Sequence, residues 1–234
     1  MRPLVILPTY NERENLRPLA GRILDLRDDI SVLVVDDNSP DGTGRMADEL
    51  SAVEPRVSVL HRTAKEGLGA AYCAGFAEAL AGGYDPIVTM DCDFSHDPAY
   101  IPALIDAVGD AGMAIGSRYV RGGGVRRWGV HRKVLSRCAN IFARKMLGLR
   151  SHDCTSGFRS FRRSTLEGLG IEDIVSNGYS FQVEVLYRCE RAGVRVVEVP
   201  IIFIDRRMGR SKMSKNEIIG GIFSVLQVRR RTGL

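Results

Sequence analysis

Short apolar segments alternate with segments of helical periodicity through the first 119 residues, and this alternation restricts the fold more than any other feature. The apolar segments have the length of strands, and the segments between them repeat apolar residues at helical spacing. The expected strands are residues 3–9, 31–37, 57–62, 86–91 and 111–119, and the expected helices are residues 14–26, 41–52, 67–81 and 97–108. Strands that alternate with helices form right-handed βαβ units, so the sequence predicts an α/β fold with a mostly parallel sheet covered on both faces.

The pattern changes after Arg121. The remaining expected elements are a flexible basic loop over residues 122–129, a helix over 131–149, a strand over 195–205 and an amphipathic helix over 217–231. The strand is expected at a sheet edge, because Pro200 cannot donate a hydrogen bond to a neighbouring strand. No internal repeat or low-complexity tract is found, and the chain is expected to be a single domain, residues 1–234, with a basic C-terminal third.

The cysteines and the apolar segments indicate the cellular compartment. The five cysteines are odd in number and form no CxxC pair, which argues against a disulfide framework or a zinc site and favours a reducing compartment. The N-terminal apolar run is too short for a signal peptide. The longest uncharged C-terminal stretch, residues 218–228, is well short of the about 20 residues that cross a bilayer. No segment is expected to span a membrane unaided.

Basic residues are concentrated in two segments of a chain whose net charge is +5. Residues 118–150 contain ten Lys and Arg and no acid, and residues 206–231 contain eight against one acid, Glu217. A solvated basic face is the ordinary explanation for such a segment. The alternative is an anionic partner, which would be nucleic acid, a phosphorylated ligand or an acidic lipid.

Three of the predicted strands end in polar motifs, PTYNE (8–12), DDNSPDGT (36–43) and DCDFSH (91–96). In an open α/β sheet, ligands bind outside the carboxyl ends of the strands. Each motif alone could be a turn that caps the next helix. Together they bring four carboxylates to one edge: Glu12, Asp37, Asp91 and Asp93. Neither a GxGxxG motif after the first strand nor a P-loop occurs, so the two common phosphate-binding loops are not supported.

Asp91 and Asp93 end an apolar run and are separated by one residue. Two like charges this close repel each other and raise one pKa unless a positive group lies between them. A metal cation, an arginine or water at a loop could each satisfy the pair.

Seven motifs give the chain a resemblance to a known family. They are PTYNE (8–12), VVDDNSPDGT (34–43), GLGAA (67–71), DCDFSH (91–96), GSRY (116–119), DCTSGFR (153–159) and DRRMGRSK (205–212). In this order they resemble the family-2 glycosyltransferases of GT-A fold and, more narrowly, the polyprenol-phosphate (dolichol-phosphate) mannose synthases. The resemblance covers nearly the whole chain. It implies that residues 1–121 bind a nucleotide sugar and that residues 122–234 bind the acceptor and face a membrane.

The resemblance identifies Asp91-Cys92-Asp93 as the DxD motif. It implies that Asp91, Asp93 and Ser95 bind Mg²⁺ or Mn²⁺, hard cations that prefer oxygen ligands. The cation would bridge the diphosphate of the donor and neutralise charge as the nucleotide leaves. Some relatives have Gln at the position of Ser95. Because the serine side chain is shorter than that of glutamine, Ser95 is expected to contact the metal through water. His96 is expected to pack or to act indirectly, because a hard ion prefers oxygen.

The same resemblance implies a nucleoside pocket and a set of cations. The nucleoside pocket would be lined by Pro8, Tyr10, Glu12, Val35 and Asp37, with Cys92 and Arg118 also near the nucleotide sugar. Tyr10 could equally be a packing residue, and Glu12 could cap the following helix. The expected cations are Arg118, Arg132, Arg206 and Lys212. Of these, Arg206 and Lys212 would lie on a loop that closes over the donor diphosphate.

Arg118, Arg132 and Ser136 are expected to bind the acceptor phosphate, and Asp93, Arg118 and Arg132 are the expected catalytic residues. For any single arginine in so basic a chain, a solvated surface position is the ordinary alternative. The implied reaction is inverting transfer of mannose from GDP-mannose to a polyprenyl or dolichyl monophosphate. A lipid phosphate is already ionised near neutral pH, so no general base is required, and positioning and electrostatic stabilisation would supply the catalysis.

Two other activities remain open from the sequence. A polyprenyl-phosphate glucosyltransferase that uses UDP-glucose would have the same fold. A non-catalytic nucleic-acid-binding protein would need stacking aromatics in its basic segment, where 118–150 has only Tyr119, Trp128 and Phe142. That hypothesis also leaves Asp91 and Asp93 unexplained, so no nucleic-acid partner is expected.

The expected location is peripheral, on the cytoplasmic face of a membrane. Helices 131–149 and 217–231 are basic and amphipathic, as interfacial helices are, although the first could equally cover the sheet. Some relatives carry C-terminal transmembrane helices and others recruit a small membrane partner. Since this chain ends at Leu234 with neither, it is expected to be a soluble-type synthase or one module of a larger protein.

Overall fold

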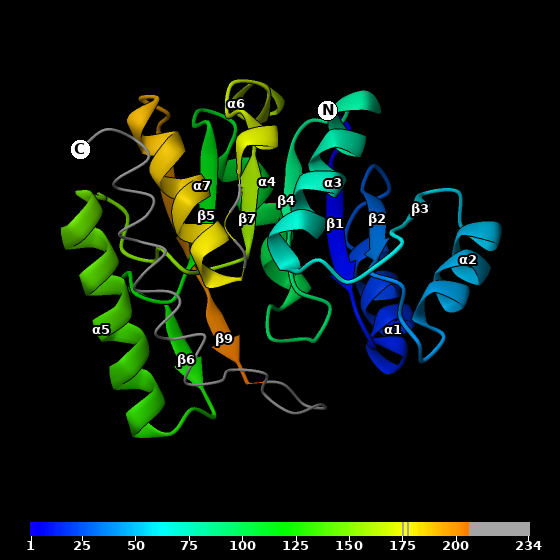
Figure 1. Ribbon diagram of the computed structural model, residues 1–234, viewed down its shortest axis with the longest axis horizontal. Coiled ribbons are helices and arrows are strands. Elements are labelled where there is room, and N and C mark those ends of the chain that lie inside the picture. The colour runs from blue at the N-terminus through cyan, green and yellow to red at the C-terminus, as the bar shows by residue number, and fades with distance from the viewer. Residues whose placement is uncertain (175, 177, 206–234) are drawn as a thin grey trace.

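The computed structural model describes residues 1–205 except 175 and 177, and its core is a seven-stranded sheet of order β3-β2-β1-β4-β7-β5-β8 (Figure 1). The strands of this sheet are β1 (Leu4–Thr9), β2 (Ser31–Asp36), β3 (Val57–His61), β4 (Ile87–Thr89), β5 (Met113–Ser117), β7 (Arg159–Phe161) and β8 (Val196–Pro200). Two further strands, β6 (Gly124–Arg126) and β9 (Ile202–Ile204), form a separate parallel pair. In the large sheet, β7 runs antiparallel to both of its neighbours, and the other pairs are parallel.

Helices cover both faces of the sheet. The α-helices are α1 (Arg13–Leu24), α2 (Thr43–Val53), α3 (Leu68–Ala81), α4 (Ile101–Ala107), α5 (Val130–Leu147), α6 (Arg163–Glu167) and α7 (Tyr179–Arg191), with short 3-10 helices η1 (Pro98–Tyr100) and η2 (Ile171–Asp173). Successive residues of a strand point to opposite faces. Accordingly, Leu4 and Ile6 of β1 pack in the core with α3 and α7, whereas Val5 and Leu7 pack in a second core with α1, α2 and α4. The continuous apolar composition of β1 is therefore what a strand buried on both sides requires.

All five strands and four helices expected in the first 119 residues are present, which confirms the mostly parallel α/β prediction. The helix expected over 97–108 begins with η1 and continues as α4. The helix expected over 131–149 is α5. The helix expected over 217–231 lies outside the described residues. No helix in the described part of the chain combines the length and apolarity needed to cross a bilayer.

Two predictions for the second half need correction, and some of its elements were missed. Residues 122–129 are not entirely loop, because β6 forms there by pairing with β9. The single strand expected over 195–205 is divided in two: β8 lies at the sheet edge, as expected, and β9 leaves the sheet after Ile201. The division falls at Ile201, whose N–H still donates to the carbonyl of Ser117 at 3.0 Å. Pro200 is tolerated before it because β8 is an edge strand, where a missing N–H breaks no ladder. Strand β7 and helices α6 and α7 were not predicted at all.

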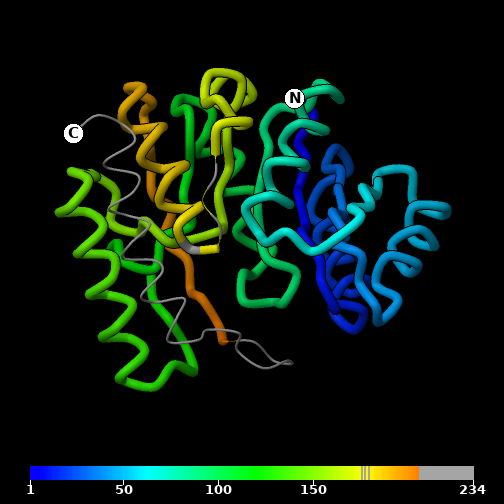
Figure 2. Tube along the Cα trace, viewed as in Figure 1, coloured from blue at the N-terminus to red at the C-terminus, as the bar shows by residue number. Residues whose placement is uncertain are grey.

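The antiparallel direction of β7 determines which segments reach the sheet edge where ligands bind. The carboxyl ends of β1, β2, β4 and β5 lie at this edge, because β1, β2 and β4 are parallel and β4 and β5 are both antiparallel to β7. An antiparallel strand instead begins there. Residues 153–158 therefore arrive at the same edge immediately before β7, and the chain from β5 to β7 leaves the edge and returns to it (Figure 2).

Candidate active site

The turn after β4 carries the two closely spaced carboxylates. Asp93 is 4% exposed, and its Oδ1 accepts a hydrogen bond from the backbone N–H of Ser95 at 2.9 Å. The Asp91 side chain is 32% exposed. The buried Ser95 Oγ has no hydrogen-bond partner among the described residues. A buried hydroxyl without a partner is costly, so the turn presents oxygen atoms in a polar environment that a bound group could complete.

These oxygen atoms fit a hard divalent cation. The described residues contain no group of three or more His, Cys, Asp and Glu side chains that could hold a metal by themselves. Two carboxylates and a hydroxyl suit Mg²⁺ or Mn²⁺, because these ions accept oxygen ligands and keep some coordination positions for water or substrate phosphates. The donor set therefore fits a cation shared between protein and substrate.

His96 packs beneath this turn. Its Nδ1 accepts a hydrogen bond from the backbone N–H of Asp91 at 3.3 Å, and its ring lies against the rings of Phe158 and Phe203. Burial lowers the pKa of His96, despite the nearby charges of Asp91 and Asp93. The enclosed ring packs against aromatic side chains, which agrees with the expectation of a packing or indirect role without testing it.

The residues expected to line the nucleoside pocket lie at the ends of β1 and β2. Pro8 and Val35 are paired directly across the two strands. Asp37 is 5% exposed, and its Oδ1 accepts a hydrogen bond from Arg62 at 2.6 Å. Burial raises the pKa of Asp37, while the Arg62 charge opposes the rise. Asp37 is thus a largely enclosed carboxylate held by a cation that the sequence did not identify.

Tyr10 and Glu12 follow β1 and are partly buried. The ammonium of Lys65 lies 3.9 Å from the centroid of the Tyr10 ring. Glu12 occupies the N-cap position of α1, and its side chain accepts a hydrogen bond from Asn15 at 2.8 Å. Glu12 therefore stands at the N-cap position, but its side chain makes no capping hydrogen bond to the backbone of α1. The Tyr10 ring is covered by a cation.

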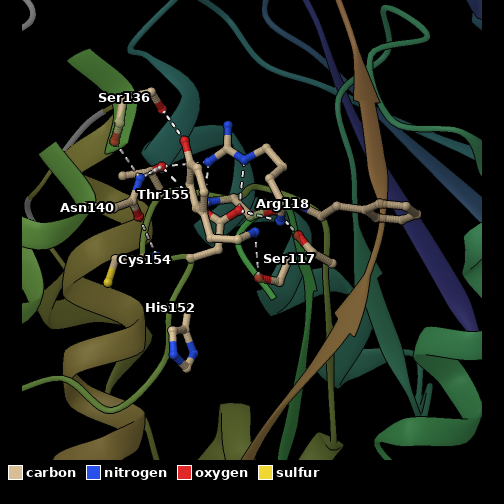
Figure 3. Close-up of polar contacts among 12 residues, drawn as sticks. Ser117, Arg118, Ser136, Asn140, His152, Cys154 and Thr155 are labelled. Carbon is tan, nitrogen blue, oxygen red and sulfur yellow. Dashed lines mark hydrogen bonds and ion pairs between the residues drawn. The ribbon is translucent and has the colours of Figure 1, made fainter. Parts of the chain in front are cut away.

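Arg118 forms a buried ion pair with Asp153 at the end of β5 (Figure 3). Its Nε donates to Asp153 Oδ2 and its Nη2 to Oδ1, both at 2.7 Å, and Nη2 also donates to Thr155 Oγ1 at 2.7 Å. Arg118 is 7% exposed and Asp153 is 0% exposed. The guanidinium orientation is therefore fixed by the segment before β7. Asp153 lies within the DCTSGFR motif, but nothing in the sequence paired it with Arg118.

Asp153 should make stability depend on pH. Burial alone would raise the pKa of its carboxyl, but the charge and hydrogen bonds of Arg118 hold the pKa below the ordinary value of 3.8. Because the folded-state pKa is the lower one, the stabilisation is present above pH 3.8 and is lost as the pH falls from there through the folded-state pKa. We expect the free energy of unfolding, measured with urea at a series of pH values, to fall more steeply below that pH than in Asp153→Asn. If the free energy of unfolding had the same pH dependence in the wild type and in Asp153→Asn, the lowered pKa of Asp153 would be contradicted.

Arg132 and Ser136 lie one turn apart on α5, so they share a face of this helix. Arg132 pairs with Asp205 at 2.8 Å, and its guanidinium lies 4.3 Å from the centroid of the Trp128 ring. The hydroxyls of Ser136 and Tyr119 are hydrogen-bonded at 2.7 Å. Trp128 is also contacted by the guanidinium of Arg118, at 5.8 Å from its centroid. One indole thus brings the two expected acceptor-binding arginines into one cluster.

Strand β9 connects the arginine cluster with the carboxylate turn. The Phe203 ring lies 5.3 Å from the His96 ring and 5.5 Å from the Arg118 guanidinium carbon. The backbone N–H of Ile204 donates to the carbonyl of Ser95 at 3.1 Å. Carboxylates and arginines therefore adjoin at one site. Arg206 and Lys212, the other two expected cations, lie outside the described residues.

The fold and the site define a glycosyltransferase of GT-A fold. The family model described as "Glycosyl transferase family 2" matches residues 4–170, and the chain belongs to this family. It is 51% identical to the polyprenol monophosphomannose synthase of Mycolicibacterium smegmatis, over 97% of this chain and 86% of the relative. It is 50% identical to the undecaprenyl-phosphate mannosyltransferase of Micrococcus luteus, over 92% of this chain and 88% of that relative. These matches confirm the family resemblance and the expectation of a glycosyltransferase.

Solved structures share the fold. Glucosyl-3-phosphoglycerate synthase of Mycobacterium tuberculosis, in complex with Mn²⁺, UDP and glucosyl-3-phosphoglycerate, superposes with a TM-score of 0.68 at 19% identity, over 98% of this chain and 78% of that one. A mannosyltransferase of Pyrobaculum calidifontis, in complex with GDP-Man and Mn²⁺, superposes with a TM-score of 0.66 at 18% identity, over 100% of this chain and 65% of that one. At this identity the similarity extends to the fold alone.

Proposed function

We propose that this protein transfers mannose from GDP-mannose to a polyprenyl or dolichyl monophosphate, with inversion at the sugar. The observation that carries the proposal is the adjacency of an oxygen-rich turn, formed by Asp91, Asp93 and Ser95, and a cluster of arginines next to it. The first suits a metal-bound diphosphate and the second suits a phosphate monoester. The names of the two relatives at about half identity support mannose as the sugar and a polyprenyl phosphate as the acceptor.

Asp91, Asp93 and Ser95 would hold Mg²⁺ or Mn²⁺, which stabilises the charge that develops on a departing nucleoside diphosphate. Buried Asp93 is fixed by the Ser95 N–H and needs little rearrangement to bind a cation. Pro8, Tyr10, Glu12, Val35 and Asp37 would enclose the nucleoside, and Cys92 lies buried between the two ligands. In this pocket the enclosed Asp37 carboxylate can accept hydrogen bonds from a base or ribose.

Arg118, Arg132 and Ser136 would orient the acceptor phosphate. Arg118 is held rigidly by Asp153, whereas Arg132 is half-buried and would exchange Asp205 for the incoming phosphate. Because the attacking oxygen is already ionised near neutral pH, these residues need only align it with the sugar carbon. Arg206 and Lys212 would balance the remaining charge of the donor diphosphate.

The test is a transfer assay with radiolabelled GDP-mannose, Mn²⁺ or Mg²⁺, and undecaprenyl phosphate. A lipid-extractable, acid-labile mannose product that disappears with EDTA is the expected result. UDP-glucose in parallel examines the alternative donor, and calorimetric titration with GDP and UDP in Mn²⁺ compares the nucleotides directly. Product from UDP-glucose alone, or transfer undiminished by EDTA, would contradict the proposal.

Helix α5 is proposed to dock the enzyme on the cytoplasmic face of a membrane. Its inner face buries Ala143 and Leu147, so it also covers part of the fold. Its outer face exposes large apolar side chains among basic residues: Val130 (76% exposed), Val134 (57%), Leu135 (41%) and Ile141 (45%), beside exposed Lys133 and Arg137. Apolar side chains rimmed by cations are typical of a helix that lies on an anionic lipid surface.

We expect Val134→Glu to weaken binding to phosphatidylglycerol-containing vesicles by about tenfold, because the apolar contact is lost and an anion faces anionic lipid. Sedimentation with vesicles measures the effect. Val53→Glu is the matched control, since Val53 is 75% exposed on α2, at the opposite side of the molecule from α5 (Figure 1). Equal losses in both variants would argue against α5 as the docking surface.

A further inference from the structure

Asn140 is a buried residue of α5 that no sequence motif marked. It is 2% exposed. Its Oδ1 accepts a hydrogen bond from the backbone N–H of Cys154 at 2.8 Å, and its Nδ2 donates to the carbonyl of Ser136 at 2.9 Å (Figure 3). The same Nδ2 donates to Thr155 Oγ1 at 3.2 Å. One side chain therefore joins α5 to the segment that precedes β7.

Thr155 Oγ1 is the point at which Asn140 and Arg118 meet. It receives Nη2 of Arg118 at 2.7 Å and Nδ2 of Asn140 at 3.2 Å. The segment that carries this hydroxyl is itself fixed to the sheet, because the backbone N–H groups of His152 and Asp153 donate to Glu198 of β8 at 2.8 and 3.0 Å. A continuous chain of hydrogen bonds thus runs from the sheet through Thr155 to α5.

This chain connects two groups that would bind one ligand. Arg118 follows β5, whereas Arg132 and Ser136 lie on α5, so their relative positions depend on how α5 is held. A phosphate gripped from two elements is bound well only when both present their donors at the right separation. Asn140 lies one helical turn after Ser136 and donates a hydrogen bond to its carbonyl. It therefore holds the part of α5 that carries Ser136 at a fixed distance from Arg118.

We infer that Asn140 is a positioning residue for the acceptor phosphate, which fixes α5 against Arg118 through Thr155. The inference rests on the proposed function, because that function supplies the acceptor phosphate bound by Arg118, Arg132 and Ser136. Asn140 acts through its neighbours and does not itself touch the substrate. Substitution of a positioning residue weakens binding of the acceptor. Substitution of a residue that only satisfies buried polar groups lowers the stability of the fold.

The experiment uses the full chain with Asn140→Asp and Thr155→Val. Asn140→Asp keeps an oxygen for the Cys154 N–H but replaces the donating Nδ2. Thr155→Val keeps the side-chain shape and removes the shared hydroxyl. The matched control is Thr165→Val, since Thr165 is also buried and its hydroxyl donates to the carbonyl of Gly112 at 2.8 Å, away from the site. KM for undecaprenyl phosphate, KM for GDP-mannose and GDP affinity with Mn²⁺ are measured for each.

Both test variants are expected to raise the KM for the lipid phosphate by about tenfold, the equivalent of one or two buried hydrogen bonds. KM for GDP-mannose and GDP affinity should stay within about twofold of wild type, and Thr165→Val should change neither KM. Wild-type acceptor KM in both test variants, or the same rise in Thr165→Val, would overturn the inference while leaving the proposed function intact. A wild-type protein that binds GDP but transfers to no polyprenyl phosphate would overturn the proposed function and the inference together.

Discussion

Asp93→Ala is expected to reduce mannosyl transfer by at least about a thousandfold, because a ligand of the catalytic cation would be lost. The fold should survive the change. Asp93 lies in the turn after β4 rather than in either core, and the hydrogen bond that it accepts from the Ser95 N–H holds this turn rather than the sheet. The transfer rate with GDP-mannose and undecaprenyl phosphate measures the first effect, and thermal unfolding measures the second.

Asp97→Ala is the matched control for Asp93→Ala. Asp97 lies four residues further on, where it accepts a hydrogen bond from Ala99 N–H and pairs with Arg22 on the surface. We expect this variant to lose a small amount of stability and to keep its transfer rate. Substantial turnover in Asp93→Ala, or Mn²⁺-dependent GDP binding equal to that of wild type, would show that Asp93 is not a metal ligand.

Arg118→Gln is expected to destabilise the protein by about 3 kcal/mol, because Asp153 would remain as an unpaired buried charge. The double variant Arg118→Gln/Asp153→Asn should recover most of this loss, since the charge is removed while the carbonyl oxygen still accepts from Ser156 N–H. Transfer should fall by at least about a hundredfold in both variants, because neither presents a cation to the acceptor phosphate. Urea unfolding at neutral pH separates the two effects.

An exposed pair provides the comparison for Arg118. Arg22 and Asp97 are 3.1 Å apart with side chains 51% and 37% exposed, and Arg22→Gln should cost less than about 1 kcal/mol. If the Arg118/Asp153 double variant proved no more stable than Arg118→Gln, the lost stability would come from hydrogen bonding rather than from an unpaired charge. Recovery of transfer in the double variant would remove Arg118 from the proposed catalytic residues.

The sequence predicted the half of the fold whose pattern is local. The apolar runs of β1 to β5 and the helices between them follow from periodicity, and their parallel arrangement follows from the alternation. Strand β7 has only three residues, Arg159–Phe161. It follows a loop directly, so no change of sequence pattern marks where it begins. Its position between β4 and β5 depends on pairing over long sequence separations, which periodicity does not encode.

In the candidate site, too, the sequence predicted the residues of local motifs but not their partners from distant parts of the chain. Asp91 and Asp93 were found because they stand one residue apart in a short motif at the end of a predicted strand. The partners that hold the site are distant in sequence: Asp153 lies 35 residues from Arg118, and Arg62 lies 25 residues from Asp37. The chain has 33 Lys and Arg residues, and nothing in the sequence distinguishes Arg62 from the others. Only the folded arrangement places its guanidinium on a nearly enclosed carboxylate.

The direction of β7 has a consequence for how such enzymes diversify. Because β5 and β7 are antiparallel neighbours, residues 118–158 form an excursion whose two ends stay anchored side by side in the sheet. Insertions between closely spaced anchors cost little conformational entropy and leave the underlying scaffold unchanged. This excursion carries α5, Arg132 and Ser136, whereas Asp91 and Asp93 lie outside it. Under the proposed function, exchanging this excursion for another would redirect the sugar to a new recipient and leave the turn with Asp91 and Asp93 unchanged.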